Sequence, residues 1–119
     1  MSDLKLKPIY ELVLEHIHVC EERISKISKA KDFTDSNEGK VLFDAITMRL
    51  QAMGENVKRA SKINQQLLEK YPEVQWDSII RFRDYVSHHY ELLDHEVVFD
   101  IAKHHLTALK IAIEKELNS

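Results

Sequence analysis

The sequence predicts an all-α protein, an antiparallel up-and-down four-helix bundle with room for one short extra helix. Three observations lead to this class. The 119 residues include only two Gly and two Pro, so turns are few. Charged residues make up 31% and hydrophobic residues 44%, a composition typical of amphipathic helices. Apolar residues recur at steps of three and four, which is the spacing of a helix with one buried face. The length is that of one domain, residues 1–119.

The first two helices follow from this apolar spacing. One is expected over about residues 8–30. The polar stretch after it contains Asp35-x-x-Glu38, a capping arrangement that begins a second helix. The apolar stripe of this second helix continues to Tyr71-Pro72, where the proline ends it.

The last two helices are shorter. Helical spacing predicts the third over residues 76–90. The chain is expected to turn near Asp94, because Asp94 and Glu96 are good residues for the start of a fourth helix, which runs to the C-terminus. Cys20 is the single cysteine, so a disulfide framework is excluded, and its spacing predicts a thiol in the core.

Charge and hydropathy limit the function. The net charge of -3 argues against a protein that coats nucleic acid through bulk basic charge, but it leaves open a local cluster of cations that binds RNA. No apolar run approaches the roughly 20 residues of a membrane span, and the N-terminal sequence MSDLKLKP has no apolar signal core. We therefore expect a cytoplasmic protein without a membrane partner.

The third helix has two faces of different character. On a helical projection the predicted core arc holds Ile79, Phe82, Tyr85, Val86, His89, Leu92 and Leu93. The opposite arc, predicted to point away from the core, holds Arg81, Arg83, Asp84, Ser87, His88 and Tyr90, with Trp76 beside it. Arg83 and His88 lie about 140° apart on an ideal helix. Their pairing would need the reach of the arginine, a distorted helix end or a second subunit. The alternative is a solvated face with a weak Asp84–His88 pair.

The polar arc carries a recognisable order of residues. Arg83-Asp84-x-x-x-His88-x-Tyr90, preceded by Trp76-x-x-Ile79 and Arg81, resembles the Arg-(Asn or Asp)-x-x-x-His-x-Tyr signature of the HepT-like branch of the HEPN superfamily. Asp44, Ala45 and the Gly54-Glu55 pair stand where that branch has an Asp, an apolar stretch and a Gly-Glu pair. The resemblance covers about residues 5–110. The branch often has Asn at the position of Asp84. The aspartate of this chain adds a negative charge beside the expected phosphate site.

The resemblance implies a HEPN-like bundle and a toxin endoribonuclease that cleaves RNA without a metal or other cofactor. His88 would transfer a proton near neutral pH, and Arg83 would stabilise the charge that develops on the phosphate. The RNA 2'-hydroxyl would be the nucleophile, so cyclic-phosphate ends are expected and DNA is not a substrate. The positions expected to bind substrate or support the site are Asp84, Tyr90, Glu55 and Asp44. His89 is expected to be structural.

The resemblance also implies partners. Two subunits would form a homodimer in which the motifs face a shared cleft, and a cognate MntA-like nucleotidyltransferase antitoxin would transfer AMP to Tyr90. Gly54 lies inside a strong helix at a cost of about 1 kcal/mol relative to Ala, which indicates close approach of another backbone. On the same helix, Asp44, Gln51, Glu55, Lys58 and Lys62 form a polar arc. Its lysines could supply local positive charge, and a plain exposed face is the alternative.

Two other function classes stay open. One is a non-catalytic HEPN module that binds substrate or protein for an associated nucleotidyltransferase. The other is a metal-binding bundle, suggested by seven His residues and by Glu15-x-x-His18. That motif is half of what a carboxylate-bridged site with two metals uses, and a second copy does not occur in the sequence.

Overall fold

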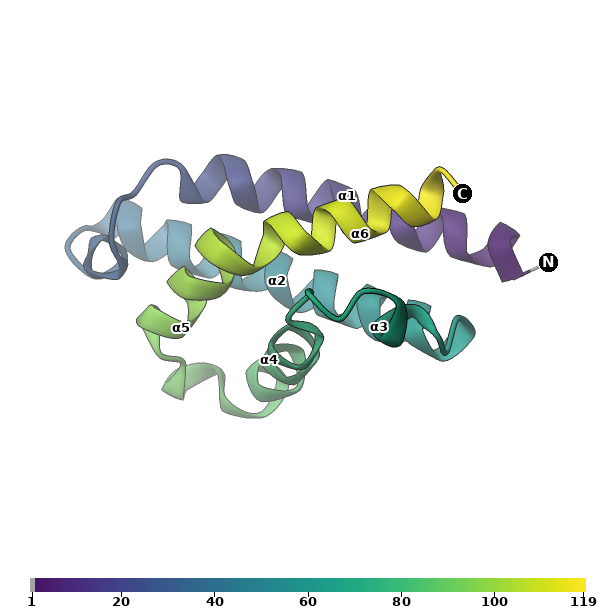
Figure 1. Cartoon of the computed structure of the whole chain (residues 1–119). Coiled ribbons are helices and arrows are strands. Elements are labelled where there is room, and N and C mark those ends of the chain that lie inside the picture. The colour runs from purple at the N-terminus through teal and green to yellow at the C-terminus, as the bar shows by residue number, and fades with distance from the viewer. Residues whose placement is uncertain (1) are drawn as a thin grey trace.

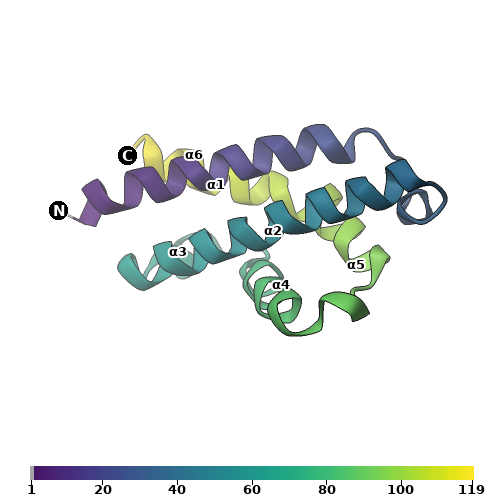
Figure 2. The same ribbon diagram turned by 180° about the vertical axis from the view of Figure 1, so that it is seen from behind.

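The computed structural model describes residues 2–119, with side chains from residue 4. Three helices run side by side in both views of the molecule, α1 (Ser2–Ile24), α2 (Asn37–Ile63) and α6 (Leu106–Leu117) (Figures 1 and 2). α1 packs against both of the others. α4 (Trp76–His89) packs on α2 and is seen nearly end-on in both views, so it runs across α2. The predicted all-α bundle is confirmed, with one helix crossing the others.

Short elements connect these helices. A 3-10 turn, η1 (Ala30–Phe33), precedes α2, and the one-turn helix α3 (Leu67–Lys70) follows it. Another 3-10 turn, η2 (Tyr90–Leu92), follows α4. The expected fourth helix consists of three consecutive segments, which are α5 (His95–Asp100), the π-helical turn η3 (Ile101–His105) and α6. Within residues 2–119 no strand occurs, and no helix is long and apolar enough to cross a bilayer.

Several predicted helix boundaries were wrong. α1 begins before Pro8, because a proline close to a helix end removes only one hydrogen bond. It ends at Ile24, before the predicted residue 30. The cap of α2 is Ser36, whose Oγ accepts a hydrogen bond from the Gly39 N–H at 2.9 Å, in place of Asp35. α2 ends at Ile63, well before Pro72. The predicted start of the fourth helix is confirmed, since the Asp94 carboxylate caps α5.

The core forms where α1, α2 and α6 meet. Its fully buried side chains include Val13, Ile17 and Cys20 of α1, Met53 and Val57 of α2, and Leu109 and Ile113 of α6. Burial raises the pKa of the Cys20 thiol to about 12, so it stays protonated and packs as a small apolar group. The predicted core position of Cys20 is confirmed.

The predicted core arc of the third helix was too wide. Phe82 and Val86 are buried, but Tyr85 is 44% and Leu92 is 71% exposed, and His89 is also exposed. α4 crosses α2 instead of lying along it, so only a narrow stripe of α4 is covered. Trp76, which was expected beside the polar arc, is buried in the core. Its Nε1 donates a hydrogen bond to the Tyr71 carbonyl oxygen at 2.8 Å, which ties the start of α4 to the segment before it.

Candidate functional site

The candidate site is built where α4 crosses α2 at Gly54. A Cβ atom at this position would lie 2.8 Å from the Cβ of Arg83 and 2.9 Å from the carbonyl oxygen of Ile79. Both distances are shorter than van der Waals contact, so the crossing requires glycine. The predicted close approach of another backbone is confirmed. Because that backbone is α4 of the same chain, Gly54 is no longer an argument for a second subunit.

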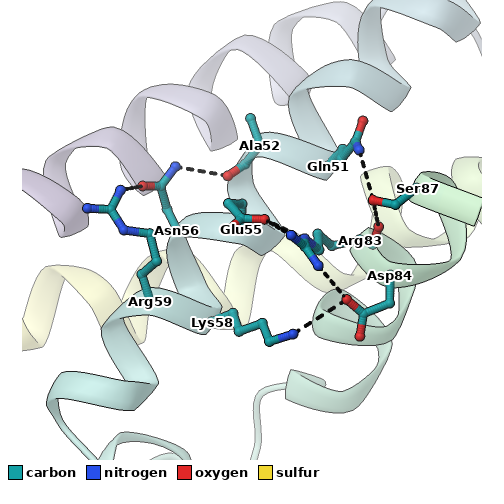
Figure 3. A network of polar contacts seen from close by, with 9 residues as sticks. All are labelled: Gln51, Ala52, Glu55, Asn56, Lys58, Arg59, Arg83, Asp84 and Ser87. Carbon is teal, nitrogen blue, oxygen red and sulfur yellow. Dashed lines mark hydrogen bonds and ion pairs between the residues drawn. The ribbon is translucent and has the colours of Figure 1, made fainter.

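The polar arc of α2 faces the polar arc of α4 (Figure 3). Gln51 Nε2 donates a hydrogen bond to Ser87 Oγ at 3.3 Å, and this hydroxyl donates to the Arg83 carbonyl oxygen at 3.1 Å. Glu55 accepts hydrogen bonds from the Arg83 guanidinium. Lys58 Nζ lies 3.6 Å from Asp84 Oδ1. The polar side chains of α2 and α4 therefore form hydrogen bonds and ion pairs with each other.

Arg83 is held between two carboxylates. Its Nε and Nη2 contact Glu55 Oε2, and its Nη1 donates to Asp84 Oδ1 at 2.8 Å. Hydrogen bonds to Asp84 and then Glu55 raise the pKa of Arg83. The hydrogen bond from Arg83 lowers the pKa of Asp84, with a further contribution from the charge of Lys58. The side chain of Arg83 remains 28% exposed, so the site has a fixed cation whose charge is balanced within the chain.

Tyr90 and Asp44 form a second contact between α2 and the end of α4. The phenol hydroxyl donates a hydrogen bond to Asp44 Oδ1. This bond, followed by partial burial and the charge of Asp44, raises the pKa of Tyr90 to about 12. The phenol is therefore protonated at neutral pH. Tyr90 is 46% exposed, so its side chain can be approached from solvent.

His88 lies apart from Arg83. Its side chain is exposed near the end of α4, and its ring centroid lies 6.3 Å from that of His89. Within residues 4–119 the His88 side chain makes no hydrogen bond or ion pair. The α-helix continues through His88 and changes to a 3-10 turn only at Tyr90. The helix therefore does not distort early enough to bring Arg83 and His88 together.

None of the six residues of the polar arc is buried, as predicted: Arg81, Ser87, His88 and Tyr90 are exposed, and Arg83 and Asp84 are half-buried. Four of them, Arg83, Asp84, Ser87 and Tyr90, nevertheless contact side chains of α2. The Asp84–His88 pair, which belonged to the alternative of a solvated face, is absent from the described part of the chain, where Asp84 pairs with Arg83 and Lys58.

The sequence indicates both polar arcs, but the hydrogen bonds and ion pairs between them were not predicted. The signal was available, because residues at helical spacing on the two arcs carry complementary charges. For the metal-binding alternative, the described residues contain no group of three His, Cys, Asp or Glu side chains that could hold a metal ion.

Comparisons with known proteins identify the family. The family described as "Ribonuclease HepT-like" matches residues 13–116. Among curated relatives from Methanocaldococcus jannaschii, "Putative RNase MJ0127" is 35% identical over 57 residues, which cover 48% of this chain and 45% of that protein. "Putative RNase MJ0125" is 29% identical over 92 residues, 77% of each chain. "Putative RNase MJ1216" is 28% identical over 92 residues, 77% of this chain and 74% of that one. No solved structure matches significantly. The chain belongs to the HepT-like ribonuclease family.

Proposed function

We propose that this protein is a toxin endoribonuclease that cleaves RNA without a metal, with Arg83 and His88 as its catalytic residues. The observation that carries the proposal is the exposed imidazole of His88 on the same helix as a fixed arginine. A histidine can accept and return a proton near neutral pH, which lets it activate the RNA 2'-hydroxyl. An arginine beside the phosphate stabilises the charge that develops as the P–O bond breaks.

The pairing of Arg83 leaves room for a phosphate. A guanidinium has five N–H donors, of which Glu55 and Asp84 use three. The remaining donors can bind one phosphate oxygen, and a second oxygen can replace Asp84 at Nη1. Glu55 then acts as a support that holds the guanidinium in position. Asp84 competes with the phosphate and sets how tightly RNA binds.

A second copy of the chain is the proposed partner that completes the site. Val41 is 68% and Met48 is 71% exposed on α2, on the same side as Asp44, and Leu92 beside Tyr90 is 71% exposed. Exposed apolar side chains gathered around a polar site are typical of an interface. A homodimer formed there would bring His88 of one subunit toward Arg83 of the other, which a single α4 cannot do.

Tyr90 is the proposed site of control by a nucleotidyltransferase antitoxin. The side chain is exposed and its hydroxyl is hydrogen-bonded to Asp44, which can take the phenol proton when the oxygen attacks the α-phosphate of ATP and displaces pyrophosphate. Transfer of AMP would place a negatively charged phosphate near Arg83, where it would compete with RNA for the cation. The alternative role of the chain, a non-catalytic binding module for such an enzyme, needs no free histidine.

The test compares the wild type with Arg83→Ala, His88→Ala and the control His104→Ala, which removes an exposed histidine on η3. Cleavage of a single-stranded RNA and of its 2'-deoxy analogue is followed on gels, together with growth inhibition on expression. Loss of His88 should slow cleavage by about 100-fold or more, whereas the control should cleave normally. The deoxy analogue should stay intact. Equal cleavage by His88→Ala and the wild type would favour the non-catalytic module.

A further inference from the structure

A cavity lies on the opposite side of α4 from the contact with α2. It encloses about 400 Å³ between α4 and the segment formed by α5 and η3. Its walls are mostly apolar, with Phe82 and Tyr85 on one side and Val97 and Ile101 on the other. Cavities of about 300 to 1,000 Å³ with apolar walls and a few polar groups are typical ligand sites. Neither the motif nor the proposed dimer explains this one.

The charged side chains around the cavity indicate the charge of its ligand. Asp94 caps α5, and Asp100 Oδ2 lies 3.3 Å from Nε2 of His105. Arg81 is different, because its exposed side chain makes no hydrogen bond or ion pair anywhere in residues 4–119. An uncommitted guanidinium beside apolar walls is complementary to a molecule that has a flat apolar part and an anionic group.

The wall formed by η3 has an unusual local structure. The π-helical turn covers Ile101–His105, and such turns occur often at functional sites. Within the described residues, His105 Nδ1 is buried and has no hydrogen-bond partner. This nitrogen is a buried polar atom of a residue that lines the cavity, and a ligand group could form the missing hydrogen bond.

The cavity is on the same side of α4 as the proposed catalytic histidine. His88 follows Arg81 by seven residues, so the two share one face about 10.5 Å apart along the axis, with Tyr85 between them. Arg83 lies on the other side, against α2. A single strand that places a phosphate at His88 can therefore reach Arg81 and Tyr85 without crossing the helix.

We propose that this cavity binds one nucleotide of a single-stranded RNA substrate, with the base against Tyr85 and the phosphate on Arg81. The proposal rests on the ribonuclease function proposed above and adds a substrate-binding subsite to it. Tyr85 suits this role because its ring is 44% exposed at the cavity wall, and aromatic rings bind bases of any sequence by stacking. Arginine binds phosphate oxygens through its planar N–H donors.

The experiment measures binding of a fluorescent 2'-O-methyl RNA, which cannot be cleaved, by fluorescence anisotropy. Arg81→Ala and Tyr85→Ala should each raise Kd by about tenfold, and Tyr85→Phe should bind like the wild type because it keeps the ring. The salt dependence should weaken by about one phosphate contact in Arg81→Ala alone. Lys103→Ala, which removes an exposed charge on η3 outside the cavity, is the matched control. If Arg81→Ala and Tyr85→Ala bind like this control, the subsite does not exist.

Two further measurements separate this proposal from the proposed function. His88→Ala should bind the 2'-O-methyl RNA normally while failing to cleave ordinary RNA. Weakened binding by Arg81→Ala in a protein that cleaves no RNA would reject the ribonuclease and keep the subsite. Active cleavage with an unchanged KM in Arg81→Ala and Tyr85→Ala would reject the subsite and keep the ribonuclease. AMP binding as tight as that of the RNA strand would show a free-nucleotide site and overturn the assignment to RNA.

Discussion

Replacing Asp84 with Asn should strengthen RNA binding. In the free chain, Asp84 Oδ1 accepts a hydrogen bond from Arg83 Nη1 at 2.8 Å and pairs with Lys58 at 3.6 Å. The amide oxygen of Asn can accept the same hydrogen bond but carries no charge. The four groups of this cluster, Glu55, Lys58, Arg83 and Asp84, would change from a formal charge of zero to +1.

The size of the effect follows from distance and exposure. A phosphate bound to the free donors of Arg83 would lie about 5 Å from the Asp84 carboxylate, because that carboxylate already occupies the neighbouring N–H. Asp84 is 46% exposed, so water screens most of the repulsion between the two anions. Coulomb's law with a water-like dielectric then gives about a fourfold gain in affinity at low salt when the charge is removed.

The assay is the Kd of an uncleavable RNA at about 50 mM and about 200 mM salt. Asp84→Asn should bind about fourfold tighter at the lower salt, and the difference should shrink at the higher salt. Asp77→Asn, two turns earlier on α4 and exposed, removes one charge away from Arg83 and should change Kd less than twofold. Unchanged or weaker binding by Asp84→Asn would refute competition between Asp84 and phosphate, and would make Asp84 a support for Arg83.

Other predictions concern the stability of the fold and the proposed modification of Tyr90. Gly54→Ala should destabilise the protein by about 1 to 2 kcal/mol, since overpacking outweighs the gain in helix propensity, and its Tm should fall by several degrees. Tyr90→Phe should cleave RNA nearly as well as the wild type but accept no labelled AMP from the proposed nucleotidyltransferase antitoxin. Burial would raise the pKa of Glu116, but hydrogen bonds from Lys70 and Tyr71 lower it. Glu116 therefore stabilises the folded protein above its unfolded pKa, and this stabilisation is lost as the pH falls through the lowered folded pKa. Glu116→Gln should remove this part of the loss of stability at acid pH, as measured by urea unfolding.

The sequence predicted the helices because each buries one apolar face, and errors arose where local contacts interrupt a continuous apolar stripe. Leu67 continues the stripe of α2 and is fully buried, yet it belongs to the separate turn α3. The apolar spacing alone could not show that α2 ends at Ile63, because the turn after it folds back on the core and buries the next apolar residues as a longer helix would. The cap at Ser36 and not Asp35 is a shift of one residue, which lies within the usual uncertainty of helix ends.

The candidate site was harder to predict than the fold. A single helix shows which residues share a face, but it does not show what covers that face. The polar arc of α4 could be solvated or could meet another polar arc, and only the crossing at Gly54 decides that Arg83 meets Glu55. The cavity beside Arg81 depends on the segment around η3, whose π-helical turn had no signal in the apolar spacing.

The separation of Arg83 from His88 gives a decisive test of the proposed dimer. α4 stays helical through His88, so the two side chains of one subunit project from different sides of α4. If the reacting phosphate lies between Arg83 of one subunit and His88 of the other, then Arg83→Ala and His88→Ala are each inactive for different reasons. A mixed dimer of the two variants contains one site with both substitutions and one site with neither.

Mixing the two inactive proteins should therefore restore cleavage. After random exchange of subunits in an equal mixture, about half of the dimers are mixed, and each has one intact site. The mixture should regain about a quarter of the wild-type rate per subunit, whereas each variant mixed with itself stays inactive. If the mixture also stays inactive although subunit exchange is shown by differently labelled copies, each site takes both residues from one chain. Arg83 would then have to reach His88 by leaving Glu55 and Asp84, and RNA binding would need to break both contacts.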